Sequence, residues 1–334
     1  MSELIPGGRE RIRALTLLSG GLDSQLAVCV LRDLGIDVQA VAFESPFFNP
    51  KAPRDAARQL DVPLHVLDFT ADIVSLVENP PHGFGSCMNP CIDCHARMLR
   101  RAGHLMEDLG FHFLSTGEVL NERPMSQNRS SLDLVARESG YASLVLRPLS
   151  AALLPPTQPE KLGWVERSRL LSLEGRGRKP QLELAARYGL KNFPNPAGGC
   201  RLTEPEFCKR LKELKDHEGL RDARAIHLLR YGRHFRLADH VKLIVGRHEG
   251  DNSFLEGNAE LYDLVLKVES HPGPSGLLPS AATEEQVQAA AAICARYSDA
   301  PPGAPATVQV RSPRGLLRLE VLPARPQDAD RWKI

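Results

Sequence analysis

Three of the seven cysteines lie within eight residues of one another: Cys87, Cys91 and Cys94. The last two are three positions apart, and a helical pattern over residues 96–110 follows. Two thiols at that spacing before a helix can point toward one metal ion, and the positive end of the helix favours thiolates. Cys200 is a distant third candidate, because Gly198 and Gly199 allow an open turn that exposes its sulfur.

Thiols in this pattern support three kinds of chemistry. Three thiolates, from Cys91, Cys94 and Cys200, suffice for a [4Fe–4S] cluster whose fourth iron stays open to an outside ligand. A zinc site is the second option if Cys87 closes it. A redox dithiol is the third. Seven cysteines in a chain of 334 residues favour metal or redox chemistry over a disulfide framework, and the residues alone leave these options open.

The second candidate motif is SGGLDS, at residues 19–24. It joins an apolar run of strand length to a helical pattern, so backbone N–H groups and the positive helix end face one spot and form an anion site. Asp23 suits that spot only if a metal cation bridges it to the phosphates. The segment matches neither G-x-x-x-x-G-K-[ST] nor G-x-G-x-x-G, which excludes two commoner nucleotide motifs.

The elements that must position these residues are short apolar runs alternating with helical patterns. Strands are predicted at 14–18, 38–43, 64–69, 111–115 and 143–147, with helices between several of them, such as 24–34 and 53–60. This alternation predicts an α/β fold with a doubly wound parallel sheet, in which ligands sit at the carboxyl ends of strands. Strand-like runs at 241–245 and 261–268, a helix near 284–297 and a hairpin at 307–322 predict a smaller C-terminal α+β domain.

We therefore expect an α/β domain over 1–203, a basic helical linker over 204–236 and the smaller domain over 237–334. The formal net charge of +1 indicates no overall preference for nucleic acid. The absence of any apolar run near ~18 residues and of a signal-peptide pattern predicts a cytoplasmic protein without a membrane association.

The SGGLDS segment resembles the PP-loop of the ATP pyrophosphatases, whose fold is of the adenine nucleotide alpha hydrolase kind. The resemblance implies that ATP is split between its α and β phosphates, that pyrophosphate stays in the loop, and that AMP passes to a substrate oxygen. It implies that ATP and Mg²⁺ are bound by Ser19, Gly20, Gly21, Asp23 and Ser24. It also places the adenine near Ala42 and Phe43, and the nucleotide pocket along Thr116-Gly117-Glu118.

Residues 89–95 (NPCIDCH) resemble the N-P-D-x-x-C-N motif of the tRNA 2-thiouridine synthases, and residues 183–200 resemble the second-cysteine region of that family. On this match Cys94 and Cys200 fall on the two functional cysteines, and Cys91 falls where many members carry aspartate. The resemblance, over roughly residues 14–205, implies a thiouridine synthase of the 2-thiouridylase or 4-thiouridine synthetase kind. Its catalytic residues would be Asp23, Cys94 and Cys200, and its metal ligands Cys91, Cys94 and Cys200.

Residues 243–255 resemble the V-G-[RK]-N-x-x-x-N-D-x-L signature of the NFACT RNA-binding domain, over roughly 235–334, with His248 in place of the first Asn. Residues 209–236 hold nine Lys or Arg against four Asp or Glu, a local excess that could grip an RNA backbone. The segment 175–179 (GRGRK) and three arginines of the helical pattern after Cys94 could extend that grip: Arg97, Arg100 and Arg101. We interpret residues 121–130, rich in amide and hydroxyl groups, as a substrate or nucleotide loop.

These features predict an ATP-dependent tRNA sulfurtransferase that adenylates a uridine carbonyl oxygen and replaces it with sulfur. A [4Fe–4S] cluster whose free iron carries hydrosulfide is the favoured sulfur route, and a persulfide on Cys200 or Cys94 is the other. The expected partners are tRNA and a sulfur donor, either inorganic sulfide or a cysteine desulfurase, with a homodimer as an open expectation. Two alternatives are an ATP pyrophosphatase with an amine nucleophile and structural zinc, and a non-catalytic RNA-binding protein.

Overall fold

The computed structural model describes residues 11–123, 125–195, 199–312 and 315–334. The chain forms two compact units: the first ends at Glu204, and the second runs from Pro205 to Ile334. Each has its own sheet and core, and each is described by itself. None of the helices in the described ranges is both long and apolar enough to cross a membrane.

A five-stranded parallel sheet forms the centre of the first unit, which confirms the predicted α/β class. Its strand order is β3-β2-β1-β4-β5, and the strands are β1 (Arg13–Leu17), β2 (Asp37–Glu44), β3 (Leu64–Asp68), β4 (Phe113–Ser115) and β5 (Val145–Leu146). The chain leaves β1 toward β2 and returns on its other side as β4, so the order reverses between β1 and β4. Ligands of open α/β sheets bind at such a reversal, outside the carboxyl ends of the strands.

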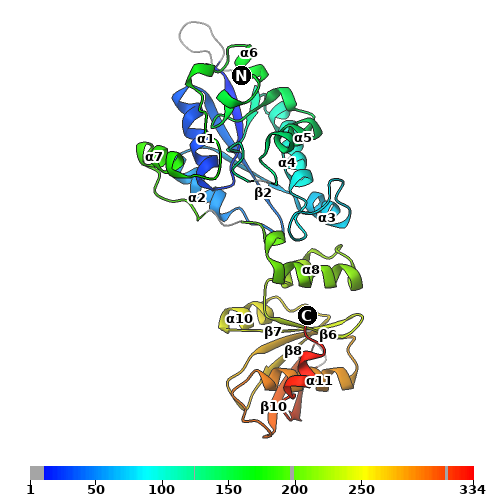
Figure 1. Cartoon of the computed structure of the whole chain (residues 1–334). Helices are drawn as coiled ribbons and strands as arrows, with labels where there is room; N and C mark the ends of the chain where they lie inside the picture. Colours follow the sequence, from blue (N-terminus) through cyan, green and yellow to red (C-terminus); the bar gives the residue numbers. More distant parts are fainter. Residues whose placement is uncertain (1–10, 124, 196–198, 313–314) are drawn as a thin grey trace. The chain divides into compact units, whose positions relative to one another are not determined.

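Helices cover both faces of this sheet (Figure 1). They are α1 (Leu22–Asp33), α2 (Lys51–Leu60), α3 (Thr70–Glu78), α4 (Cys91–Asp108), α5 (Arg129–Ser139), α6 (Gln158–Lys161) and α7 (Lys179–Arg187). Four short 3-10 helices lie at Ala142–Leu144, Ala151–Leu153, Arg167–Arg169 and Arg201–Thr203. In Figure 1, α1, α2 and α7 lie on one side of the sheet, and α4 and α5 lie on the other.

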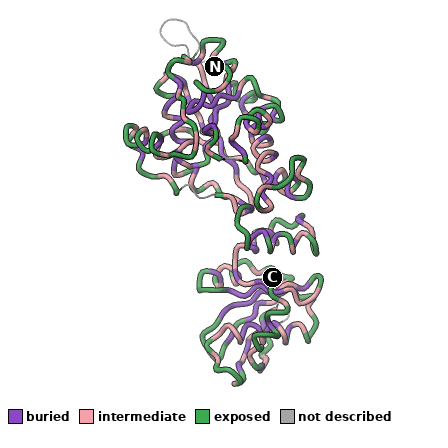
Figure 2. The backbone as a smooth tube through the Cα atoms, viewed as in Figure 1, coloured by how far each residue is buried: buried purple, intermediate pink, exposed green. Residues whose placement is uncertain are grey.

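Helix α1 shows why the PP-loop segment folds as strand, turn and helix. Leu22, Leu26 and Val30 are spaced four residues apart and are at most 4% exposed, so one helix face packs into the core. Full burial of each such side chain contributes about 1.5–3 kcal/mol. Gly35 then takes a left-handed conformation with φ of 77°, which ends the helix. Figure 2 shows the buried strands and helix faces of this core.

The second unit is built on a six-stranded antiparallel sheet, which confirms the smaller α+β domain. The order is β11-β10-β8-β9-β7-β6, with β6 (Arg233–Ala238), β7 (Val241–Val245), β8 (Asp263–Val268), β9 (Ser275–Pro279), β10 (Ala306–Ser312) and β11 (Gly315–Val321). Its helices are α8 (Pro205–Glu218), α9 (Ala223–Leu228), α10 (Glu249–Gly257), α11 (Glu284–Arg296) and α12 (Pro326–Asp330). The segment 204–236, expected as a linker, therefore contains α8, α9 and the start of β6.

Candidate nucleotide and cysteine site

The SGGLDS loop forms the turn between β1 and α1 and has little room for side chains. Gly20 has φ of +84°, and a Cβ on it would stand 2.4 Å from the backbone carbonyl carbon of Ala52, in α2. The hydroxyl of Ser24 donates to the Gly21 carbonyl at 2.9 Å, and the Gly21 N–H donates to Ser19 Oγ at 3.3 Å. The loop is thus held open as a small backbone-lined cradle at the start of α1, the geometry that anion binding requires.

The segment after β4 packs directly on this cradle. A Cβ on Gly117 would stand 2.4 Å from the Ser24 backbone nitrogen and 2.5 Å from the Asp23 carbonyl, so only glycine allows the approach. Thr116 is 4% exposed, and its hydroxyl donates to Glu118 Oε2 at 3.0 Å. The structure therefore brings Thr116 and Gly117 to the PP-loop segment from a position some ninety residues away.

Asp23 carries a buried oxygen that lacks a hydrogen-bond partner. Its Oδ1 is unpartnered, and burial raises the pKa of the carboxyl, an effect that Arg178 and Arg123 oppose. Glu122 lies close enough for the charge of Asp23 to add to the effect of burial, which raises its pKa too. An orphaned carboxylate oxygen beside a phosphate cradle has the donor chemistry of a Mg²⁺ ligand.

Sequence reasoning did not assign Arg178 to this site. Residues 175–179 were expected on an RNA surface, but Arg178 lies near Asp23. Arg123 belongs to the segment 121–130, for which we expected a substrate or nucleotide loop. The signal for Arg178 would be the pairing of residues 174–175 with Leu120, which no local pattern reveals.

Ala42 and Phe43 lie in β2, next to β1, and both are buried. The ring of Phe43 packs edge-on against Phe69, with centroids 5.3 Å apart. Their predicted place near an adenine stays a prediction.

Three cysteines of the first unit, Cys91, Cys94 and Cys200, lie near one another at the start of α4. Cys91 is the first residue of that helix, and the Asn89 side-chain amide donates to Cys91 Sγ at 3.1 Å. Burial raises the pKa of the Cys94 thiol well above its ordinary value, and Cys200 and Cys91 lie near enough to raise it further. Thus Cys200, more than a hundred residues along the chain, lies beside the α4 pair.

Three neighbouring thiols are a donor set that suits an iron–sulfur cluster or zinc. Within the described residues, no group of three or more His, Cys, Asp or Glu side chains already has a metal-binding arrangement. Residues 196–198, part of the turn predicted before Cys200, lie outside the described residues. Cys87 Sγ is 3.8 Å from the Thr203 carbonyl oxygen. Cys208 and Cys294 are buried and Cys29 packs on the core.

Glu118 connects the nucleotide side of the unit to the cysteine helix. Its carboxylate accepts from Arg147 Nε at 2.8 Å, and its other oxygen lies 3.5 Å from Nδ1 of His95, the residue after Cys94. Burial alone would raise the pKa of Glu118, but Arg147 and His95 lower it to about 2. Glu118 is therefore ionised throughout the physiological pH range, and its carboxylate lies between the side chains of Arg147 and His95.

In the second unit, the residues of the 243–255 signature stabilise a strand-to-helix turn. Arg247 Nε donates to Asp251 Oδ2 at 2.7 Å, and Asn252 Oδ1 accepts from the Ser275 N–H at 3.0 Å. A Cβ on Gly246 would stand 2.0 Å from Asn252 Oδ1, so glycine is required there. His248 caps α10 by accepting from the Asp251 N–H.

Several of the basic residues expected to grip RNA already have partners. In the second unit, Lys212 pairs with Asp216, Arg224 with Asp263 and Glu260, and Arg236 with Glu213 and Glu218. In the first unit, Arg97 and Arg101 pair with Asp72, and Arg100 donates to the Glu138 carbonyl. The excess positive charge of the sequence is therefore larger than the positive charge available to RNA.

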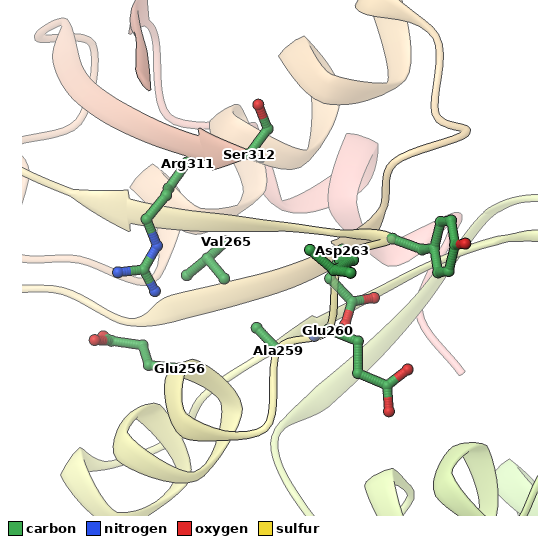
Figure 3. A pocket seen from close by; sticks show the side chains of 9 residues that line it. Glu256, Ala259, Glu260, Asp263, Val265, Arg311 and Ser312 are labelled. Atoms are coloured by element: carbon green, nitrogen blue, oxygen red, sulfur yellow. Dashed lines mark hydrogen bonds between the residues drawn. The ribbon is translucent and has the colours of Figure 1, made fainter. Parts of the chain in front are cut away.

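A surface cavity of about 670 Å³ lies in the second unit (Figure 3). Its lining includes Glu256, Glu260 and Asp263, with Arg311 as its basic member. Sequence reasoning did not find it, and its acidic lining does not suit a phosphate backbone.

Comparisons with known proteins agree with both units. Residues 10–152 match the family described as thiamine biosynthesis protein (ThiI), and residues 232–333 match the NFACT protein RNA binding domain. A tRNA-specific 2-thiouridylase MnmA of Xanthobacter autotrophicus is 25% identical over 259 residues, which are 71% of this chain and 60% of that protein. A probable tRNA sulfurtransferase of Brevibacillus brevis is 32% identical over 149 residues, 42% of this chain and 35% of that protein.

Among solved structures, a 4-thiouridine synthetase–RNA complex with bound ATP aligns at a TM-score of 0.37 and 18% identity, over 68% of this chain and 59% of that one. The chain spans less than two thirds of the length of these curated relatives. The resemblances to a thiouridine-forming PP-loop enzyme and to the NFACT domain are confirmed at the level of the family matches. Residues 10–152 of the first unit thus match the ThiI family, and residues 232–333 of the second unit match the NFACT RNA binding domain.

Proposed function

We propose that this protein is an ATP-dependent tRNA sulfurtransferase that replaces a uridine carbonyl oxygen with sulfur. The observation that carries the proposal is the gathering of Cys91, Cys94 and Cys200 in the same unit as the PP-loop. Glu118 adds to it, because the segment that packs on the PP-loop also contacts the residue after Cys94. The matches to thiouridine-forming relatives support the same reaction class.

The reaction has two steps, and this unit has groups suited to the first. The uridine carbonyl oxygen attacks the α phosphorus of ATP, the α–β phosphoanhydride bond breaks, and pyrophosphate leaves into the cradle at residues 19–24. Backbone N–H groups there receive its negative charge, and Asp23 would hold Mg²⁺ on the phosphates. In the second step, sulfur attacks the same carbon, a C–S bond forms, the C–O bond breaks, and AMP departs with the former carbonyl oxygen. ATP, uridine and hydrosulfide thus give AMP, pyrophosphate and thiouridine.

Cys91, Cys94 and Cys200 would hold a [4Fe–4S] cluster, which would supply hydrosulfide through an iron position that no protein thiol occupies. Asn89 would steady one ligand by its hydrogen bond to Cys91 Sγ. The other route uses a persulfide on Cys200 or Cys94. The terminal sulfur of the persulfide attacks the adenylated carbon, and AMP departs. The partner thiol then attacks the cysteine sulfur of the resulting S–S bond, which breaks, releases thiouridine and leaves a disulfide that an external dithiol must reduce before the next turnover.

The tRNA would be bound in part by the second unit, which carries the NFACT-type RNA-binding domain. The target base must leave its stack to reach the α phosphate of ATP. Inorganic sulfide or a cysteine desulfurase would supply the sulfur, the reaction would take place in the cytoplasm with tRNA, and a homodimer is one assembly to test.

The test is reconstitution under anaerobic conditions with tRNA, ATP, Mg²⁺ and sulfide, followed by mass spectrometry of the digested nucleosides. Thiouridine and pyrophosphate should form together, Cys200→Ser should lose thiouridine, and the matched control Cys29→Ser should keep it. Stoichiometric zinc with activity that survives Cys200→Ser would favour the amine-transferring alternative. In a parallel reaction that replaces sulfide with a cysteine desulfurase and cysteine, which deliver persulfide sulfur, a colourless, iron-free enzyme that still thiolates tRNA would remove the cluster and leave the persulfide route.

A further inference from the structure

We infer that Arg178, supported by Gln181, binds the pyrophosphate part of ATP alongside the PP-loop. The inference rests on the proposed function only for the identity of the nucleotide, and it assigns a phosphate-binding role to a residue whose sequence context suggested an RNA surface.

The segment 174–192, which contains α7, is tied to the cradle at both ends. At its start, the Gly175 N–H donates to the Leu120 carbonyl at 2.8 Å, just after the segment that packs on the PP-loop. At its end, Gln25 Nε2 donates both to the Gly20 carbonyl at 2.9 Å and to the Asn192 carbonyl at 3.1 Å. These bonds fix α7 next to the turn between β1 and α1.

Between these ties lies a group of buried polar atoms without partners. In the described ranges, Arg178 Nε, both polar atoms of the Gln181 side-chain amide and Asp23 Oδ1 are buried without an assigned hydrogen-bond partner, although Gln181 lies close enough to Asp23 to lower the pKa of its carboxyl. Gln181 is 1% exposed, so its amide is shielded from solvent. Arg178 lies close enough to Asp23 to lower the pKa of that carboxyl against the effect of burial.

Donors from Arg178 and Gln181 and an acceptor on Asp23 are complementary to one ligand, an oxyanion that carries a divalent cation. Magnesium pyrophosphate, whether free or as part of ATP, has this composition. A guanidinium binds phosphate oxygens in a forked pair of charge-assisted bonds, which suits the charge that pyrophosphate gains as it leaves. Arg176, two residues earlier and exposed, lacks any such surroundings and is the matched control.

The experiment is calorimetric titration of the full chain with three probes in the presence of Mg²⁺: ATP, inorganic pyrophosphate and AMP. Arg178→Gln should weaken the binding of ATP and pyrophosphate by about tenfold to a hundredfold, as expected for the loss of a charged hydrogen-bond pair. AMP affinity should change by less than twofold, Arg176→Gln should match the wild type, and Arg178→Lys should recover part of the loss. Thermal melting of each variant checks that the first unit still folds.

Unchanged ATP and pyrophosphate affinities in Arg178→Gln would overturn the inference, as would an equal loss in Arg176→Gln or an equal loss for AMP. If Arg178→Gln does not fold, the affinities for ATP, pyrophosphate and AMP are compared in Arg178→Lys and Gln181→Leu instead. Wild-type protein that binds both probes but forms no thiouridine would remove the proposed function and leave this site standing. A wild type that binds neither probe would overturn both.

Discussion

Replacing Glu118 with Gln should destabilise the first unit strongly, because it leaves a buried guanidinium without its anion. Arg147 and Glu118 have side chains only 7% and 12% exposed, and their contact is 2.8 Å. The pKa of Glu118 is about 2 against an ordinary 4.5, although burial alone would raise it. At 1.36 kcal/mol per pKa unit, this shift corresponds to about 3 kcal/mol of stability at neutral pH. Breaking one side of a buried pair costs a similar ~3–5 kcal/mol.

Urea unfolding measures this effect. The chain has two tryptophans, one in each unit, so Trp164 fluorescence in a Trp332→Phe background reports on the first unit alone. Glu118→Gln should lower the free energy of unfolding by about 3 kcal/mol at pH 7. The double variant Glu118→Gln/Arg147→Met should lower it by less than the sum of the two single changes. Because the pKa of Glu118 is lower in the folded state, its contribution is complete above pH 4.5 and is lost as the pH falls toward 2. Between pH 7 and pH 3.5 the wild type should therefore lose roughly 1 kcal/mol that Glu118→Gln does not lose.

Two results would refute this reasoning. One is a loss below about 1 kcal/mol in Glu118→Gln at pH 7, the size of an exposed ion pair. The other is a difference in the free energy of unfolding between wild type and Glu118→Gln that stays constant down to pH 3.5, because the Glu118 carboxyl would then not be the titrating group.

Three further predictions follow from contacts described above. Gly117→Ala should weaken ATP binding at least tenfold and lower the melting temperature of the first unit, since its Cβ would overlap the start of α1, whereas Gly177→Ala, in open space, should do neither. Asp251→Asn should weaken tRNA binding in a filter assay by about tenfold, because the carboxylate that shapes this turn accepts from the Gly232 and Arg247 N–H groups and from the Arg247 guanidinium; unchanged affinity would remove this turn from the RNA surface. Asn89→Leu should lower the reduction potential of an anaerobically reconstituted cluster, measured by redox titration, because a sulfur ligand loses an N–H donor; an unchanged potential would contradict that placement.

Local pattern predicted the elements that carry strong apolar periodicity. The run at 241–245 coincides with β7, and the helix expected near 284–297 is α11. The sequence pattern did not predict strands β6 and β9, and the reasons are physical. Arg233–Ala238 places charged side chains among apolar ones, and Ser275–Pro279 lies in a stretch rich in glycine and proline that reads as a loop. Both become strands because neighbours in the sheet satisfy their backbone groups, which a single segment cannot show.

In the candidate site too, the local motif could be predicted from the sequence, whereas the contacts between distant segments could not. The PP-loop is one contiguous motif, so residue types and order were enough to predict its turn. The approach of Gly117 and the place of Arg178 depend on backbone pairing between distant segments, and a run of basic residues does not reveal which way each side chain points. The neighbourhood of Cys94 and Cys200 was predicted from family resemblance, because nothing in the spacing of two cysteines so far apart requires it.

The ion pairs within the second unit would affect its selectivity for RNA over other polyanions. Glu213 holds both Arg236 and Lys242, and Arg224 is shared between two carboxylates. Cations neutralised in this way displace few counterions when a nucleic acid arrives, so the dependence of affinity on ionic strength should be shallower than the count of lysines and arginines suggests. Discrimination would then come more from the shape of the bound RNA than from its charge.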